Sequence, residues 1–204
     1  TSDSGSSSTD NITNDNPPTI SGTAEASSTM ELFHSGSTSL GTATANASGN
    51  WTLTTGTLAN GTYNITAKAK DAADNISAAS SALSVTVDTG APSITVIADQ
   101  IINEDSSTGA VAFTVSDALA AVAALTVASA SSDTTLVPLA NVVLGGTAAS
   151  RTETVTPAAN LNGAATVTLT LTDPAGNSSS RAFQVTVNAA NDVPIFVKGA
   201  NQTV

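Results

Sequence analysis

Residues 166–172 read Thr-Val-Thr-Leu-Thr-Leu-Thr, and this stretch decides the fold class. In an extended chain, Val167, Leu169 and Leu171 point to one side and the threonines to the other, because successive side chains of a β-strand alternate between two faces. The β-branched Thr and Val also suit a pleated, half-buried surface. The stretch therefore predicts a strand with one face in a hydrophobic core.

The same alternation continues outward along the chain, separated by turn signals such as Asn60-Gly61 and Gly145-Gly146. Six or seven short strands per unit, with turns every eight to twelve residues, are typical of antiparallel sandwiches. Residues 118–125 could form one or two helical turns, because Ala and Leu are strong helix formers, but the β-branched residues that follow favour a loop that leads into a strand. We expect strands at 19–24, 29–34, 40–45, 51–54, 61–70, 82–88, 93–97, 109–116, 122–130, 136–144, 150–156, 164–172 and 182–188.

An ordered repeat divides the chain. A loop with Asp and Asn four residues apart precedes Val-Thr-Val at 85–87 and again at 185–187, and a Pro-containing linker follows both. We therefore predict an all-β protein of two tandem domains, at residues 17–88 and 89–190. Residues 1–16 form a polar lead-in whose composition favours disorder. Residues 191–204 are expected to begin a further repeat.

Composition excludes several functions. The 204 residues carry a net charge of −11, with 16 acidic and 5 basic residues, which disfavours nucleic acid and anionic membranes as partners. There is no Cys, which excludes a Cys-based metal site, and the single His, His34, is expected to be an exposed surface residue, so the sequence gives no argument for a Ser-His-Asp triad. We therefore predict no enzyme activity. We also predict no insertion into a membrane, because no uninterrupted apolar stretch reaches about 18 residues.

Most acidic residues lie outside the expected strands, near the ends of the two domains. The loop with Asp71, Asp74 and Asn75 is expected near the lead-in acids. Asp88 is expected to meet the loop that follows residue 172, with a further Asp after an early strand. Another group is expected at the far end of the second domain. The candidate metal ligands are Asp3, Asp10, Asp15, Asp71, Asp74, Asp88, Asp117, Asp173, Asn177, Glu104, Asp105, Asn191 and Asp192.

Carboxylates that crowd together without Lys or Arg repel one another, and a hard cation would relieve that repulsion. Ca²⁺ accepts six to eight oxygen ligands in flexible geometry, which suits loops and linkers. The alternative is that Asp and Asn simply favour turns. The grouping of these residues at domain ends favours Ca²⁺ as the bound cofactor.

The first domain resembles the Ig-like repeat of large bacterial biofilm-associated adhesins. The residues that carry the resemblance are the lead-in from Asp3 to Asp15, Thr19–Glu25, Gly49-Asn50-Trp51-Thr52 and Leu58–Tyr63. The second domain resembles the bacterial cadherin-like repeat through Ile102–Asp105, Phe113–Asp117, Thr156–Asn160 and Asn191–Pro194.

These resemblances imply a type I-secreted protein on the surface of a Gram-negative bacterium, whose immunoglobulin-like and cadherin-like sandwiches form a stalk stiffened by linker Ca²⁺. The partners would be neighbouring repeats of the same chain, with any contact to host or bacterial surfaces made by other domains. The alternative is a carbohydrate-binding accessory module of a secreted protein. Such sites are usually lined by aromatic side chains, and only 3% of this chain is aromatic.

Overall fold

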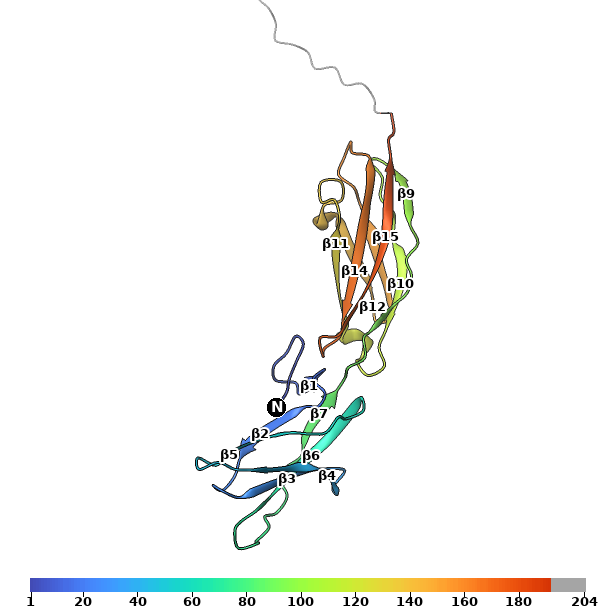
Figure 1. Ribbon diagram of the computed structural model, residues 1–204. Helices are drawn as coiled ribbons and strands as arrows, with labels where there is room; N and C mark the ends of the chain where they lie inside the picture. The colour runs from blue at the N-terminus through green and yellow to red at the C-terminus, as the bar shows by residue number, and fades with distance from the viewer. Residues whose placement is uncertain (192–204) are drawn as a thin grey trace, which may run out of the picture.

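The computed structural model describes residues 1–191 and contains two β-sandwiches placed end to end (Figure 1). Strands β1 to β7 form the first domain and β8 to β15 the second, and nearly all neighbouring strands pair antiparallel. The prediction of two tandem antiparallel sandwiches is confirmed. Among residues 1–191, no helix combines the length and hydrophobicity that a bilayer crossing requires.

The first domain packs a five-stranded sheet, in the order β1-β7-β6-β3-β4, against the pair β2-β5. Its core contains Met30, Leu32, Trp51, Ile65 and Val85, all of them buried. These residues come from both layers, so the core lies between the sheets. The strands are β1 (Ile12–Thr13), β2 (Thr19–Thr23), β3 (Thr29–His34), β4 (Thr38–Thr44), β5 (Asn50–Thr54), β6 (Gly61–Lys70) and β7 (Leu83–Val87).

The second domain packs the sheet β12-β13-β10-β8 against the sheet β11-β14-β15-β9. Val167, Leu169 and Leu171 of β14 are fully buried between the sheets, as the alternation predicts. The strands are β8 (Ser93–Ile94), β9 (Gln100–Asn103), β10 (Val111–Ser116), β11 (Thr126–Ser131), β12 (Val142–Thr147), β13 (Ser150–Val155), β14 (Gly163–Thr172) and β15 (Ser178–Asn188).

Residues 1–16 are folded onto the first domain, although their composition favours disorder. Ile12 and Thr13 form β1, which runs parallel to the end of β7 with Thr13 opposite Val87. The Asn11 carbonyl accepts a hydrogen bond from Thr86 N–H, and the Thr13 carbonyl accepts one from Asp88 N–H. The lead-in therefore lies at the end of the first domain that faces the second domain (Figure 1).

Two expected strands differ from the structure. Residues 122–130 begin as a short 3-10 turn at Val122–Ala124 before β11, and residues 136–144 contain a second turn at Leu139–Asn141 before β12. Pro138 precedes the second turn and lacks the N–H that a strand ladder needs. The sequence analysis also missed β9, which pairs parallel with β15.

Replacing Leu169 with Ala tests the core of the second domain. Leu169 is fully buried between the two sheets, so we expect Leu169→Ala to lower the free energy of unfolding of this domain by about 2–5 kcal/mol. Urea unfolding followed by circular dichroism measures the change. Leu161→Ala, at a position that is 37% exposed, is the matched control. Equal losses in the two variants would contradict the described packing.

Candidate metal centre

Asp88 lies in the linker between the two sandwiches, directly after β7. Its N–H donates to the Thr13 carbonyl at 2.8 Å, which extends the β1–β7 pairing by one residue. Its Oδ1 accepts a hydrogen bond from Gly90 N–H at 3.0 Å, as in an Asx turn. Only 3% of Asp88 is exposed. The linker backbone thus buries a carboxylate at the point where the chain leaves the first domain.

Asp173 lies in the loop that joins β14 to β15, and this loop is closed by Asn177. Asp173 Oδ1 accepts from Asn177 N–H at 2.9 Å and its Oδ2 accepts from Asn177 Nδ2 at 2.9 Å. The same Nδ2 donates to the Asp88 carbonyl at 2.8 Å. Asn177 therefore ties the loop of the second domain to the linker.

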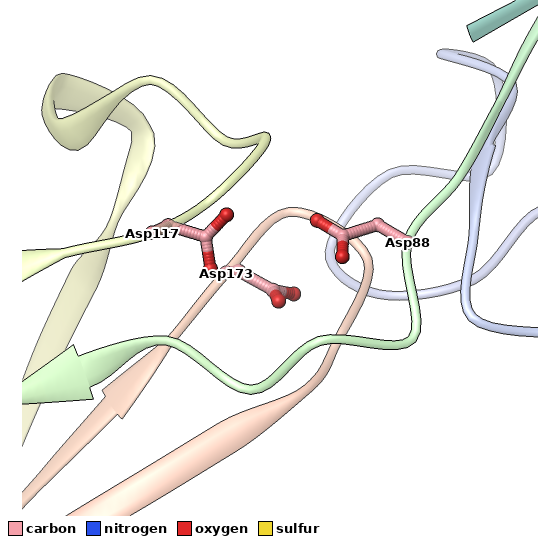
Figure 2. Close-up of side chains that lie close together, drawn as sticks. All are labelled: Asp88, Asp117 and Asp173. Atoms are coloured by element: carbon pink, nitrogen blue, oxygen red, sulfur yellow. The ribbon is translucent and has the colours of Figure 1, made fainter. Parts of the chain in front are cut away.

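Asp117 follows β10 and caps the turn that leads to the 3-10 helix at residues 122–124. Its Oδ1 accepts hydrogen bonds from Leu119 N–H at 2.8 Å and Ala120 N–H at 2.7 Å. These bonds occupy one carboxylate oxygen and fix the side chain in place. Asp117 is half-buried and lies beside the linker residue Asp88 (Figure 2).

The three carboxylates converge between the domains, as Figure 2 shows. One oxygen each from Asp88, Asp117 and Asp173 lies within 4.8 Å of the other two. No cation offsets them among the described side chains: Arg151 donates to the Ala148 and Val122 carbonyls, and Arg181 to the Ile94 carbonyl. The structure therefore concentrates negative charge on a partly desolvated junction.

The electrostatics of Asp88 reflect this crowding. Burial raises the pKa of the Asp88 carboxyl above its ordinary value, and the negative charges of Asp117 and Asp173 raise it further. The hydrogen bond from Gly90 N–H lowers the pKa and partly opposes these effects. A buried carboxylate beside two others is the environment that a bound cation would stabilise.

The lead-in adds direct contacts across the junction. Ser4 Oγ donates to the Ala175 carbonyl at 2.7 Å and accepts from Asn14 N–H at 2.8 Å. Asn14 Nδ2 donates to Asn177 Oδ1 at 3.4 Å. Gly5 has a φ of +82°, and a Cβ there would lie 1.8 Å from the Pro174 carbonyl oxygen. Residues of the lead-in thus fit closely against the loop at residues 173–177.

The lead-in acids lie at this junction but outside the group of three. Asp3 Oδ2 accepts from Asn11 N–H at 3.1 Å, and its Oδ1 is buried without a hydrogen-bond partner among the described residues. Asp10 caps Ile12 N–H at 3.1 Å, and Asp15 is exposed. Asp3 adds negative charge to this end of the first domain, whereas the positions of Asp10 and Asp15 fit ordinary turns.

The expectation that Asp71 and Asp74 lie near the lead-in acids is wrong. Their loop follows Lys70 at one end of β6, whereas Gly61 at the other end pairs with Val87 beside β1. A ten-residue strand spans about 30 Å. Asp74 forms an ion pair with Lys70 at 2.6 Å. The error came from placing the lead-in beside the wrong end of β6.

Glu104 and Asp105 lie at the far end of the second domain, after β9. Glu104 is 8% exposed and its Oε1 accepts from Ala190 N–H at 2.6 Å, while Asp105 Oδ1 accepts from Asn160 N–H at 3.0 Å. Asn191 follows Ala190 at this end. Asp192 lies outside the described residues. The structure thus brings Glu104 to the start of the next linker.

Sequence reasoning missed two groups of residues. Ser4 and Asn14 join the lead-in to the second domain, and nothing in a Ser- and Asn-rich segment distinguishes them. Glu153, fully buried in β13, was also missed. The sequence did indicate that Glu153 is buried, because in an alternating strand it points to the same side as Val155, two residues later.

Three of the five aromatic side chains in residues 1–191 are buried in the two cores, and the half-buried Phe33 lies 5.6 Å from the Lys68 ammonium, measured to the ring centroid. Trp51 is 7% exposed and packs in the first core, and Tyr63 makes an edge contact with the His34 ring at 5.4 Å. Phe113 and Phe183 are buried in the second core. The carbohydrate-binding alternative stays a prediction.

Residues 1–89 match the sequence model of a family described as bacterial Ig-like domain. The match ends just after the linker residue Asp88 and includes the lead-in. It supports the Ig-like resemblance of the first domain. No curated protein matches the chain in sequence. The cadherin-like resemblance of the second domain and export by type I secretion stay predictions.

Several solved structures are similar to this chain at low sequence identity. Fibronectin(III)-like modules of Clostridium thermocellum CbhA are 12% identical, with 92% of this chain and 93% of that chain covered and a TM-score of 0.43. Domains 4 and 5 of the S-layer protein SbsC are 15% identical, with 67% and 70% covered and a TM-score of 0.37. A domain of a biofilm-associated protein is 20% identical, with 89% and 29% covered and a TM-score of 0.29. These similarities concern the fold alone.

Asn177→Ala tests the direct contacts at the junction. The variant removes the amide that donates to Asp88 and Asp173, each hydrogen bond being worth about 1 kcal/mol. We expect a broader distribution of interdomain distances in small-angle scattering, measured in EDTA.

The control is Asn75→Ala. Asn75 closes the Asp71 loop with the same two hydrogen bonds, at 2.9 and 2.8 Å, but that loop lies far from the junction. The control should leave the scattering curve unchanged. If both variants scatter alike, the bond from Asn177 to the linker has no role in orienting the domains.

Proposed function

We propose that this chain is a structural spacer segment of a bacterial cell-surface adhesin, and that a Ca²⁺ ion bound by Asp88, Asp117 and Asp173 stiffens the joint between its two sandwiches. The observation that carries the proposal is the convergence of these three carboxylates from the linker and the second domain. The segment has no catalytic role in this proposal.

The spacing of the carboxylates fits Ca²⁺. Each Ca–O distance is at most about 2.6 Å, so two oxygens on one ion lie no more than about 5.2 Å apart. The oxygens of Asp88, Asp117 and Asp173 lie within 4.8 Å of one another. An ion could therefore contact all three with little movement of the backbone. Its remaining ligands would be backbone carbonyls or water, as Ca²⁺ readily accepts.

The comparison between the two Asp-Asn loops separates turn formation from cation binding. Asp71 and Asn75 close their loop with the same pair of hydrogen bonds as Asp173 and Asn177. The loop of the first domain is exposed and meets no further carboxylate within the described chain. Turn formation therefore explains the loop itself but not the placement of Asp88 and Asp117 beside Asp173.

The mechanical consequence follows from charge. At about 4.8 Å, two carboxylates repel by roughly 3 kcal/mol when the effective dielectric constant is about 20. Without the ion, this repulsion opposes the hydrogen bonds that Asn177 and Ser4 form across the junction. With the ion, Asp88 is attracted to the second domain, and the angle between the domains becomes fixed.

The family match of residues 1–89 and the resemblance support the proposed location and partners. Modules of bacterial Ig-like type, joined in series, suit an extended structure on the outside of the cell, and the partners would be neighbouring repeats. At the far end, Glu104, Asp105, Asn191 and Asp192 would contribute to the corresponding joint with the next repeat. A Gram-negative host and type I secretion belong to the same proposal.

Ca²⁺ removal and one matched pair of variants test the joint. Extracellular sites of this kind bind Ca²⁺ with Kd values of about 10⁻⁴–10⁻³ M, so about 10 mM Ca²⁺ should add roughly 1.4–2.7 kcal/mol of stability. We expect the melting temperature to rise by several degrees over the value in EDTA, and the interdomain distances from small-angle scattering to narrow.

Asp117→Asn should abolish most of this Ca²⁺ effect, because an amide keeps the cap on Leu119 and Ala120 but loses the charge. Asp133→Asn is the control, since Asp133 Oδ1 caps Thr135 N–H and Leu136 N–H in the same way away from the junction. Identical melting and scattering with Ca²⁺ and with EDTA in the unaltered protein would refute the proposal.

A further inference from the structure

Glu153 is a carboxylic acid enclosed in the core of the second domain. Its exposed fraction is 0%, and neither Oε1 nor Oε2 has a hydrogen-bond partner within the described chain. It shares the inward face of β13 with Val155, which belongs to the hydrophobic core. Across the sheet, Glu153 lies opposite Val111 of β10 and Leu144 of β12. The side chain is thus surrounded by apolar strands.

No charged group compensates Glu153. The described strands β8, β9, β10, β11, β12 and β14 contain no titratable residue. Arg151 is two residues away on β13, but its guanidinium donates to the Ala148 and Val122 carbonyls. Arg181 on β15 donates to the Ile94 carbonyl. The acids in the loops and linkers next to these strands all accept hydrogen bonds from backbone N–H groups: Asp99, Glu104, Asp105, Asp117, Asp133 and Asp173.

A charged carboxylate in such surroundings is strongly disfavoured, whereas its neutral form costs much less. Burial raises the pKa of Glu153 from 4.5 to about 7. The folded domain therefore binds the Glu153 proton more tightly than the unfolded chain does. Its contribution to stability is fully present below about pH 4.5 and is lost as the pH rises through about 7.

The element that an ionised Glu153 would disturb first is the hairpin β12–β13. β12 is the edge strand of its sheet, and its Val143 and Leu144 are 60% and 37% exposed. Because β12 has no partner on the outer side of the described sheet, moving this hairpin outward would let water reach the carboxylate. We propose that Glu153 is a pH-dependent switch in the second domain: uncharged, it keeps the β12–β13 hairpin packed, and charged, it loosens the hairpin.

This switch is independent of the proposed Ca²⁺ site. Val111, opposite Glu153, is six residues before Asp117, which corresponds to about 20 Å along β10. An experiment can therefore refute the Ca²⁺ site without refuting the pH switch, and the reverse. All measurements of the switch are made in EDTA, so that protonation of the junction carboxylates cannot act through cation release.

The test measures unfolding of the intact chain in urea between about pH 5 and pH 8.5. Trp51 and Tyr63 both lie in the first domain, so Trp51 fluorescence reports that domain alone. Hydrogen exchange of peptides from β12 to β14 reports the second. For the unaltered protein, we expect the folding equilibrium constant of the second domain to fall by up to about tenfold per pH unit as the pH rises towards 7.

Glu153→Gln removes the titration and should flatten most of this pH dependence. Glu153→Leu should leave the domain more stable than the unaltered protein at about pH 8.5, which keeps the test decisive if the Gln variant does not fold. Glu31→Gln, at a half-buried glutamate of β3 in the first domain, should leave the pH profile of the second domain unchanged.

The carboxyl ¹³C chemical shift of Glu153, followed by NMR as a function of pH, reports the ionisation of this side chain directly. Its midpoint should lie near pH 7, and the protection factors of β12–β13, which correct for the intrinsic rise of amide exchange with pH, should fall over the same pH range. Parallel pH profiles for the unaltered protein and Glu153→Gln would overturn the proposal, as would an ordinary carboxyl titration of Glu153.

Discussion

The arrangement of the two sandwiches depends on how the linker residue Asp88 is held. Its backbone is fixed to the first domain by the bond to Thr13 and to the second by the bond from Asn177. The same geometry places its carboxylate beside Asp117 and Asp173. Of these two bonds only the one from Asn177 crosses the junction, and a hydrogen bond of about 1 kcal/mol is weaker than the repulsion of roughly 3 kcal/mol between two of the carboxylates. The proposed divalent ion would reverse the sign of this interaction, which is why the stiffness of the junction is expected to depend on it.

The fold and the two-part architecture could be predicted from the sequence because both are encoded locally. The alternation at residues 166–172 predicts which side chains are buried, and Val167, Leu169 and Leu171 are all buried. The 3-10 turns before β11 and β12 were missed because short β-branched runs look alike in strands and in loops that lead into them. The lead-in was missed because Ser- and Asn-rich segments carry no periodicity, although β1 needs only two residues to pair with β7.

The candidate site was predicted in part, for a reason that lies in topology. The meeting of Asp88 with Asp117, Asp173 and Asn177 follows from strand direction alone: β10 and β14 both end at the edge of the second domain that faces the linker. The position of the lead-in acids could be predicted only from the pairing of β1 with the end of β7, and no local sequence pattern indicates that pairing. Asp71 and Asp173 have similar sequence surroundings and the same loop geometry, so only the fold distinguishes them.

Glu153 and Asp88 are both buried carboxylates, but their surroundings assign them opposite chemistry. Asp88 meets two other carboxylates at an interdomain surface, where the proposed cation would favour the charged form. Glu153 is enclosed by apolar strands with no charged partner, so burial favours its protonated, uncharged form. Higher pH ionises both groups, yet it would favour cation binding at the joint while weakening the packing of the second domain. Opposite responses of the joint and the core to one variable follow directly from the difference in what surrounds each carboxylate.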